Sequence, residues 1–196
     1  MSRIDELVTE QVANGVRYVT LAEVAEYSPT RVDASRLDKT SFTGVDNLVA
    51  NRGGRNDASY LPNAARLTAY RRGDILLGNI RPYLKKVWLA TGPGGCSGDV
   101  LAVRIKASSR RNLTPKFLYY AISSDDFFAY SMQYAKGAKM PRGNKDAILN
   151  YRIPIPPLEV QREIVRILDN YSQLEAELEL RATGSRRTGQ GGSSTR

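Results

Sequence analysis

The stretch Tyr151–Val165, YRIPIPPLEVQREIV, decides the fold because it joins a strand to a helix. Apolar and polar side chains alternate over its first residues, which predicts a short strand. Pro156 cannot donate a ladder hydrogen bond, and Pro157 suits the first turn of a helix, where the backbone N–H has no intrahelical partner anyway. We therefore expect a globular body to end at Pro157 and a C-terminal helix to begin after it.

Apolar residues after the proline pair recur at alternating spacings of three and four, which is the narrow seam of a coiled coil. We expect this seam to bind a second copy or a partner protein through Ile164, Ile167, Tyr171, Leu174 and Leu178. Two repeats are too few for a stable isolated coil, so the seam could instead pack on this chain's own body. We predict a helix over residues 158–181 and a disordered tail over residues 182–196, which have no apolar residue beyond Ala182.

The body before the proline pair combines helical and strand patterns. Apolar residues at helical spacing predict a helix over residues 2–14, and short strands are predicted between residues 41 and 104. Thr114 is expected to cap a helix that begins at Pro115, a second helix is expected over residues 125–135, and Asn144 can cap a short helix through Leu149. The glycine-rich run 92–98 is typical of a turn. We predict an α+β fold, with one mixed, twisted β-sheet and flanking helices over residues 1–157, followed by a long coiled-coil-type helix.

The composition excludes most kinds of catalytic site. The chain has 196 residues and no histidine, so it cannot build a His/Cys zinc site, a Ser-His or Cys-His nucleophile pair, or an imidazole base. It also lacks a phosphate-binding loop and a dinucleotide fingerprint. A metal-dependent nuclease would have to use scattered carboxylates such as Asp57, Asp74 and Asp99, and this is a weaker alternative.

Cysteine content and hydropathy indicate the compartment. Cys96 is the single cysteine and cannot form an internal disulfide, which is typical of a reducing environment. No apolar run approaches the roughly 18 residues needed to cross a bilayer. We expect a cytoplasmic protein that does not enter the membrane.

The positive charge is concentrated in the body. Residues 1–157 hold 23 Lys/Arg and 14 Asp/Glu, a net charge of +9, whereas residues 158–180 have a net charge of −4 and residues 181–196 of +4. A basic body is suited to a polyanion, and nucleic acid is favoured over a membrane surface because no basic amphipathic helix is visible.

Four motifs now show a resemblance to a known family. They are Ile153-Pro-Ile-Pro-Pro-Leu-Glu-Val-Gln-Arg-Glu-Ile-Val165 with Ile167-Leu-Asp169, Thr43-Gly-Val-Asp-Asn-Leu48, Gly73-Asp-Ile-Leu-Leu-Gly-Asn-Ile-Arg-Pro-Tyr-Leu-Lys85, and Phe117-Leu-Tyr-Tyr120. Together they resemble a target recognition domain, and the helix leaving it, in the specificity subunit of type I restriction–modification enzymes. The resemblance covers roughly residues 17–180.

The resemblance implies a DNA-reading protein with no catalysis of its own. In this family each recognition domain reads one half of a bipartite target in double-stranded DNA, and long helices hold methyltransferase subunits. Those subunits methylate adenine with S-adenosylmethionine, and a separate motor-nuclease subunit cleaves unmodified DNA. The resemblance therefore implies no cofactor on this chain, with S-adenosylmethionine, ATP and magnesium on the partner subunits alone.

A full specificity subunit carries two recognition domains and two helical spacers, whereas this sequence contains one of each. The chain therefore resembles a half-length or truncated form of the subunit. Recognition of a two-part site would then depend on a homodimer, held by the C-terminal helix.

Three stretches combine cations for phosphates with planar or amide groups for base edges. Arg52 and Arg55 would fork onto guanine and Asn51 and Asn56 would pair with adenine, with Tyr60 nearby. The second stretch contributes Arg81, Tyr83, Lys85 and Lys86, and the third offers phosphate contacts through Lys136, Lys139, Arg142 and Lys145.

Each of these groups also has a purely structural interpretation. The charged side chains could be solvated loop or strand-end residues, and the tyrosines could pack in the body. A stand-alone nucleic-acid-binding regulator, which needs no methyltransferase partner, would share the basic body and is the main alternative function.

Overall fold

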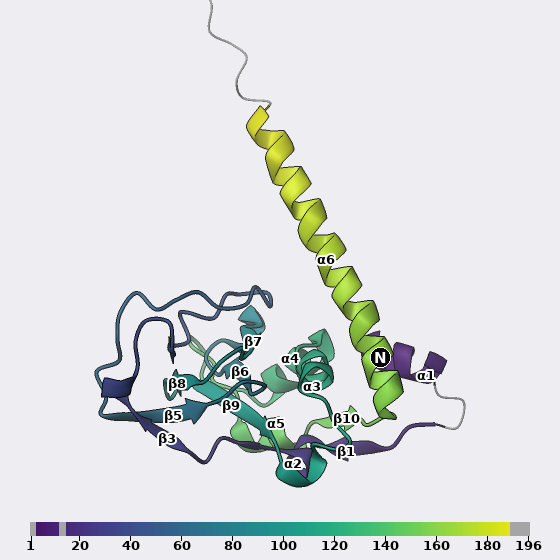
Figure 1. Cartoon of the computed structure of the whole chain (residues 1–196), viewed down its shortest axis with the longest axis horizontal. Helices are drawn as coiled ribbons and strands as arrows, with labels where there is room; N and C mark the ends of the chain where they lie inside the picture. The colour runs from purple at the N-terminus through teal and green to yellow at the C-terminus, as the bar shows by residue number, and fades with distance from the viewer. Residues whose placement is uncertain (1–2, 12–14, 189–196) are drawn as a thin grey trace, which may run out of the picture.

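We describe a computed structural model of the chain, which covers residues 3–11 and 15–188. The strands and shorter helices form one body, and helix α6 (Leu158–Thr188) projects from this body as a rod (Figure 1). The predicted α+β class is confirmed, and the helix begins directly after the proline pair as expected.

The strands form three sheets rather than the single sheet that was predicted. A two-stranded antiparallel sheet pairs β1 (Tyr18–Thr20) with β10 (Arg152–Pro154). The second sheet is antiparallel, in the order β2 (Ala25–Tyr27), β9 (Val100–Ile105), β6 (Ile75–Gly78) and β7 (Val87–Leu89). The third sheet is mixed, with a parallel β4–β8 pair, in the order β3 (Arg31–Asp33), β5 (Arg66–Tyr70), β8 (Gly94–Cys96) and β4 (Phe42–Thr43).

The helices begin where side chains can cap their free backbone N–H groups. Thr114 accepts a hydrogen bond from the N–H of Phe117 at the start of α3 (Pro115–Ile122), and Ser124 does the same for α4 (Asp125–Gln133). Asn144 caps α5 (Lys145–Asn150), as predicted. The remaining helices are α1 (Arg3–Gln11), α2 (Leu21–Val24) and the 3₁₀ turns η1 (Ala34–Arg36), η2 (Pro82–Leu84) and η3 (Ala107–Ser109).

The largest core cluster joins the helices to the second sheet and to the base of α6. Its fully buried side chains include Phe117, Phe127, Ile153 and Ile164, so the first turns of α6 share the core of the body. The predicted N-terminal helix is present over α1, which packs against α6 through Ile4, Leu7 and Val8, while residues 2 and 12–14 lie outside the described part.

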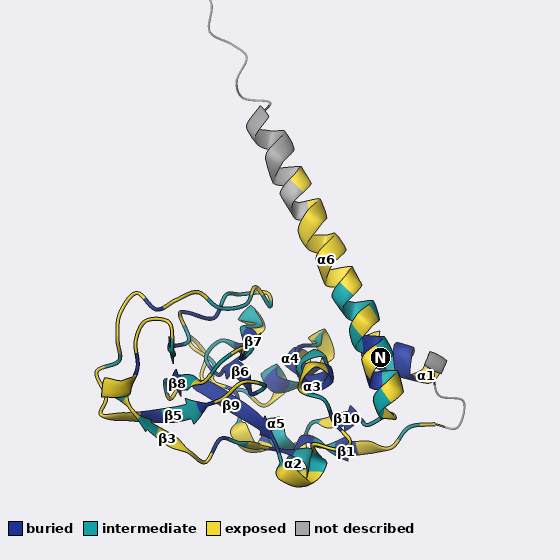
Figure 2. Cartoon of the chain, viewed as in Figure 1, coloured by how far each residue is buried: buried dark blue, intermediate teal, exposed yellow. Residues whose placement is uncertain are grey.

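The coiled-coil seam divides into a buried part and an exposed part, as Figure 2 shows along α6. Ile164 is completely buried, so the prediction that it binds a partner is wrong, whereas Ile167 is partly buried against the core cluster and its contact with a partner stays a prediction. Tyr171, Leu174 and Leu178 are 52%, 56% and 65% exposed and continue the same stripe beyond the body.

Two predicted boundaries need correction. α6 continues to Thr188, so its predicted end at Arg181 is too early and the part of the predicted disordered tail up to Thr188 is helical, whereas residues 189–196 lie outside the described part. The glycine run 92–98, predicted as a turn, contains strand β8.

Candidate nucleic-acid interface

The structure brings the three predicted DNA-contacting stretches together through backbone hydrogen bonds. The N–H groups of Asn51 and Arg52 donate to the carbonyl oxygens of Leu84 and Lys85, each at 2.9 Å. On the other side of η2, the N–H of Arg81 donates to the carbonyl oxygen of Pro141 at 2.7 Å. The loop around η2 is therefore the centre of a three-loop surface, which we define by residues 51–53, 79–86 and 136–143.

Backbone strain is concentrated at this three-loop surface. In residues 3–11 and 15–188, the non-glycine residues with positive φ are Asn51, Arg52, Arg81 and Lys85, at 50° to 62°. Such conformations cost free energy for residues with a Cβ atom and persist where the surrounding structure fixes them, which is common at functional sites. The strain therefore marks the same loops that the charges and amides of the sequence indicated.

Two of the cations on this surface share one carboxylate. Lys85 Nζ donates to Asp125 Oδ1 at 2.8 Å, and Arg52 Nη2 contacts the same oxygen while Arg52 Nε donates to the carbonyl oxygen of Ser123. The hydrogen bonds from Lys85 and Arg52 lower the pKa of Asp125 below its ordinary value, which keeps this carboxylate charged at neutral pH. Arg52 is thus held against the start of α4 instead of projecting towards a base.

Arg55 has a structural position that does not fit the predicted reading of guanine. Its side chain is only 8% exposed, and Nη2 donates to the carbonyl oxygens of Thr40 at 2.7 Å and Phe42 at 3.1 Å. Nε donates to Thr43 Oγ1, and the guanidinium lies over the ring of Trp88. The sequence suggested a free loop arginine because the acceptors come from a distant segment. In the structure Arg55 stabilises its own loop, and base reading by this residue stays a prediction.

Other members of the predicted set are exposed. The loop 136–140 is exposed throughout and is closed by reciprocal backbone hydrogen bonds between Lys136 and Arg142. The exposed side chain of Arg142 pairs with Asp99 at 2.6 Å. Lys139 and Lys145 are also exposed, and Lys86 donates to the carbonyl oxygen of Val45 at 2.8 Å.

The tyrosines and Asn56 that were predicted to contact DNA lie in two separate parts of the body. Tyr83 is 49% exposed on η2, within the three-loop surface. Tyr60 is also exposed, but its hydroxyl donates to Asp46 at 3.4 Å and its ring packs near Phe42. Together with exposed Asn56, Tyr60 belongs to the segment that follows Arg55 and not to the three-loop surface.

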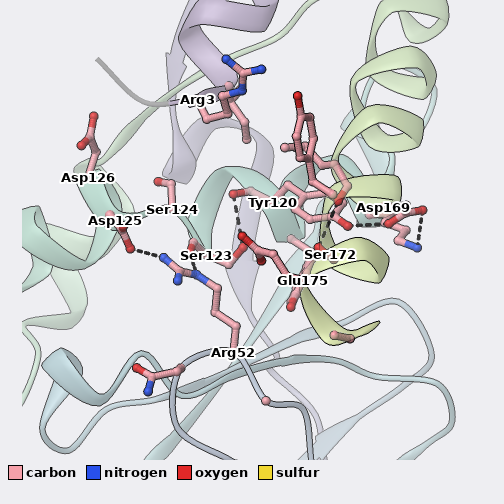
Figure 3. A pocket seen from close by; sticks show the side chains of 18 residues that line it. Arg3, Arg52, Tyr120, Ser123, Ser124, Asp125, Asp126, Asp169, Ser172 and Glu175 are labelled. Atoms are coloured by element: carbon pink, nitrogen blue, oxygen red, sulfur yellow. Dashed lines mark hydrogen bonds and ion pairs between the residues drawn. The ribbon is translucent and has the colours of Figure 1, made fainter. Parts of the chain in front are cut away.

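A groove of about 1100 Å³ separates the three-loop surface from α6 (Figure 3). Arg52 and Asp125 line one wall, while Tyr120, Asp169 and Glu175 line the side towards α6. Tyr120 Oη donates to Asp169, and this hydrogen bond together with burial raises the pKa of the tyrosine above its ordinary range. The groove thus combines carboxylates and tyrosines with cations such as Arg3, Arg52 and Lys116, and its charge is more mixed than that of the loop 136–143.

The sequence analysis missed the role of Gln161, which fixes the direction in which α6 leaves the body. The side chain is fully buried, and Nε2 donates to the carbonyl oxygens of Asn112 at 2.7 Å and Pro156 at 2.9 Å. Oε1 accepts from the N–H of Thr114 at 3.0 Å. The signal that could have revealed this role is a polar residue one turn before Ile164, at a position where the helix enters the core.

The carboxylates considered for a nuclease site are held in separate ion pairs. Asp57 contacts Arg55, Asp74 contacts Arg104 and Asp99 contacts Arg142. Within the described part of the chain, no cluster of three or more His, Cys, Asp or Glu side chains could hold a metal ion. None of the helices described is long and apolar enough to span a membrane.

Comparison with known proteins decides the family. The family model for the type I restriction modification DNA specificity domain matches residues 15–182. The chain belongs to this family. The resemblance inferred from the four sequence motifs is therefore confirmed.

Three proteins of the family are similar to this chain and are longer than it is. The EcoDI specificity subunit of Escherichia coli is 32% identical over 94 residues, which are 48% of this chain and 20% of that protein. The crystal structure of the HsdS subunit from Thermoanaerobacter tengcongensis superposes with a TM-score of 0.70 at 24% identity, covering 94% of this chain and 52% of that one. The S subunit from M. genitalium gives a TM-score of 0.53 at 14% identity, covering 90% and 44%. The chain thus spans about half the length of these solved subunits, whose likeness shows the shared fold.

Proposed function

We propose that this chain is the DNA-reading specificity subunit of a type I restriction–modification complex, in a form with one target recognition domain. It reads one half of a bipartite target and directs adenine methylation and cleavage by its partner subunits. The observation that carries the proposal is the convergence of three cation-bearing loops on one strained surface, in a chain of the specificity-domain family.

The chemistry of each side chain indicates whether it contacts phosphates or bases. Lys136, Lys139, Lys145 and Arg142 supply cations for phosphates, while Asn51 and Tyr83 supply an amide and an aromatic face on the same surface. The chain itself carries no cofactor in this proposal. S-adenosylmethionine, ATP and magnesium act on the methyltransferase and motor-nuclease subunits, and the complex works in the cytoplasm.

A homodimer is the second part of the proposal. The exposed stripe of Tyr171, Leu174 and Leu178 lies on a helix that already stands clear of the body, so two copies can meet without unfolding either one. Two identical bodies related by a two-fold axis would read an inverted repeat. Between Leu158 and Leu178, α6 carries five carboxylates and two arginines, which disfavours contact with DNA and leaves this part of the helix to proteins.

The stand-alone regulator is the alternative that shares most of these features. It would use the same basic loops but would have no methyltransferase partner. Purification of the chain from cells that also express a cognate type I methyltransferase subunit separates the two functions. Stable co-purification supports the specificity subunit, and recovery of the chain alone under the same conditions contradicts it.

The decisive experiment co-expresses the chain with that methyltransferase subunit and maps methylated adenines across the genome. We expect methylation at one recurring bipartite sequence, and an inverted repeat of a single half-site indicates the homodimer. Two unlike halves would contradict the homodimer, and a genome without a recurring methylated sequence would contradict the whole proposal. Methyltransferase expressed without this chain is the control.

A further inference from the structure

Arg81 differs from the other three arginines predicted to contact DNA, because its guanidinium has no acceptor among the described residues. Its Nε is buried without a hydrogen-bond partner, whereas Arg52, Arg55 and Arg142 donate to oxygen atoms of this chain. In the part of the chain that the structure describes, Asn79 Oδ1 is the one other buried side-chain oxygen or nitrogen without a partner. Nε itself is shielded from solvent, whereas the two Nη groups are not among the buried atoms and have no acceptor in this part of the chain, so they are the groups that can bind an acceptor from another molecule.

Two hydrogen bonds hold the backbone of Arg81 in a fixed conformation. Its N–H donates to the carbonyl oxygen of Pro141 at 2.7 Å, and its carbonyl oxygen accepts from the N–H of Leu84 at 2.9 Å. The residue adopts a left-handed conformation with φ of 50°, which a non-glycine residue keeps only when its neighbours impose it. The main chain that carries the guanidinium is therefore fixed before any ligand arrives, which reduces the entropy lost on binding.

The reach of the side chain indicates which part of DNA it contacts. Arg81 is half-buried in the centre of the three-loop surface, whereas residues 136–140 beside it are exposed. Base edges lie at the floor of a major groove about 8.5 Å deep, while phosphates line its rim. A half-buried arginine reaches the rim and not the floor, and its planar fork matches two phosphate oxygens.

We propose that Arg81 binds a backbone phosphate of double-stranded DNA and so fixes how the three-loop surface is oriented on the duplex. It carries no sequence information in this role, which leaves base reading to exposed side chains of the neighbouring loops. The inference rests on the proposed DNA-binding function and assigns one residue within it. The loops that contain Asn79 and Gly143 pack closely beside Arg81, since a Cβ atom at Gly143 would lie 2.6 Å from Asn79 Oδ1.

The test compares Arg81→Met, which keeps the length of the stem, with Arg81→Lys, which keeps the charge. Fluorescence anisotropy of the full chain is measured on the target duplex found by methylation mapping and on a scrambled duplex, each at several salt concentrations. We expect Arg81→Met to weaken both complexes about tenfold and to reduce the slope of log affinity against log salt by about one. Arg81→Lys retains most of the affinity and the slope, because lysine still neutralises a phosphate.

The matched control is Arg166→Met, which removes one paired arginine from the exposed face of α6. It should leave both affinities unchanged. Thermal melting of each variant separates lost contact from lost folding, and Arg81→Gln replaces the methionine variant if the latter does not fold. Unchanged affinity in Arg81→Met, or a loss confined to the target duplex, overturns the role of Arg81. Failure of the unmodified chain to bind either duplex instead overturns the proposed function.

Discussion

Gln161 on α6 accepts a 3.0 Å hydrogen bond through Oε1 from the backbone N–H of Thr114, the residue that caps α3. One buried side chain therefore connects the first turn of the projecting helix to the start of a core helix. The same amide donates to the carbonyl oxygens of Asn112 and Pro156, so it binds three backbone groups in two segments, one before α3 and one before α6. This explains why a glutamine, and not an apolar residue, occupies the buried position one turn before Ile164.

Replacing Gln161 with alanine should lower the free energy of unfolding by about 2–4 kcal/mol. The change leaves buried backbone groups without partners and opens a cavity at the base of α6. Urea unfolding followed by circular dichroism measures the loss. Gln173→Ala is the control, because Gln173 lies exposed on the same helix and should change stability by less than about 0.5 kcal/mol. Equal effects of the two substitutions would contradict the anchoring role.

The buried ion pair between Asp74 and Arg104 should be far more important than an exposed one. Arg104 Nη2 donates to Asp74 Oδ2 at 2.7 Å, and the two side chains are 9% and 3% exposed. Arg104→Met leaves the buried Asp74 with only the backbone N–H of Arg71 at 2.9 Å and a 3.9 Å contact with Arg71 Nε, and should cost about 3–5 kcal/mol of stability. Arg66→Met, at the exposed pair with Asp33, should cost less than about 1 kcal/mol in the same denaturation experiment. A small loss for Arg104→Met would show that Asp74 finds another partner or a proton.

Arg55 should affect folding and not sequence preference. Arg55→Met removes hydrogen bonds to Thr40, Phe42 and Thr43, and we expect a stability loss of about 2–4 kcal/mol. The ratio of affinities for target and scrambled duplexes should stay unchanged at a temperature where the variant is folded. Asn56→Ala, at the exposed neighbouring position, is the control for stability. A stable variant with an altered base preference would restore the original sequence-based interpretation.

Local signals in the sequence predicted the helices well, because periodicity and capping residues act within a few positions. Thr114 and Asn144 cap helices as predicted, and the proline pair precedes α6. The strands were harder, since β8 consists of Gly94, Gly95 and Cys96 and shows no alternation. A Cβ atom at Gly94 would lie 2.1 Å from the carbonyl oxygen of Ser41 and 2.4 Å from the Tyr70 ring. These glycines therefore permit close strand packing, which a sequence alone presents as a turn.

The candidate site was predictable in residue type but not in geometry. Charge and amide content identified the loops that come together, yet the acceptors of Arg55 come from residues 39–43 and those of Arg52 from the start of α4. The spacing of apolar residues predicted which side chains lie on one face of α6. It did not predict how many of them the body buries, because that depends on tertiary packing. Ile164 and Leu178 share a heptad position and differ completely in burial.

The exposed part of the seam should hold the proposed dimer. Leu174→Asp places a charge on the stripe that also contains Tyr171 and Leu178, and we expect the mass in sedimentation equilibrium to fall from that of a dimer to that of a monomer. Gln173→Asp adds the same charge beside the stripe and should leave the mass unchanged. Since Leu174 is 56% exposed, the substitution should not unfold the body, and the melting temperature checks this. A dimer that survives Leu174→Asp must be held by another surface.

Asp125 should restrain DNA binding, because it is a carboxylate within a cationic surface. It holds Lys85 at 2.8 Å and also contacts Arg52, and its lowered pKa keeps it negative at neutral pH. Asp125→Asn removes that charge and releases two cations, so we expect affinity for target and scrambled duplexes to rise by about three- to tenfold, with a steeper dependence on salt. The stability cost should be below about 1 kcal/mol, because the side chain of Asp125 is 71% exposed.

Glu163→Gln, which removes one carboxylate paired with Arg166 on α6, is the charge-matched control and should change neither affinity. Equal gains from both substitutions would attribute the effect to net charge, and no gain from Asp125→Asn would place DNA away from Arg52 and Lys85.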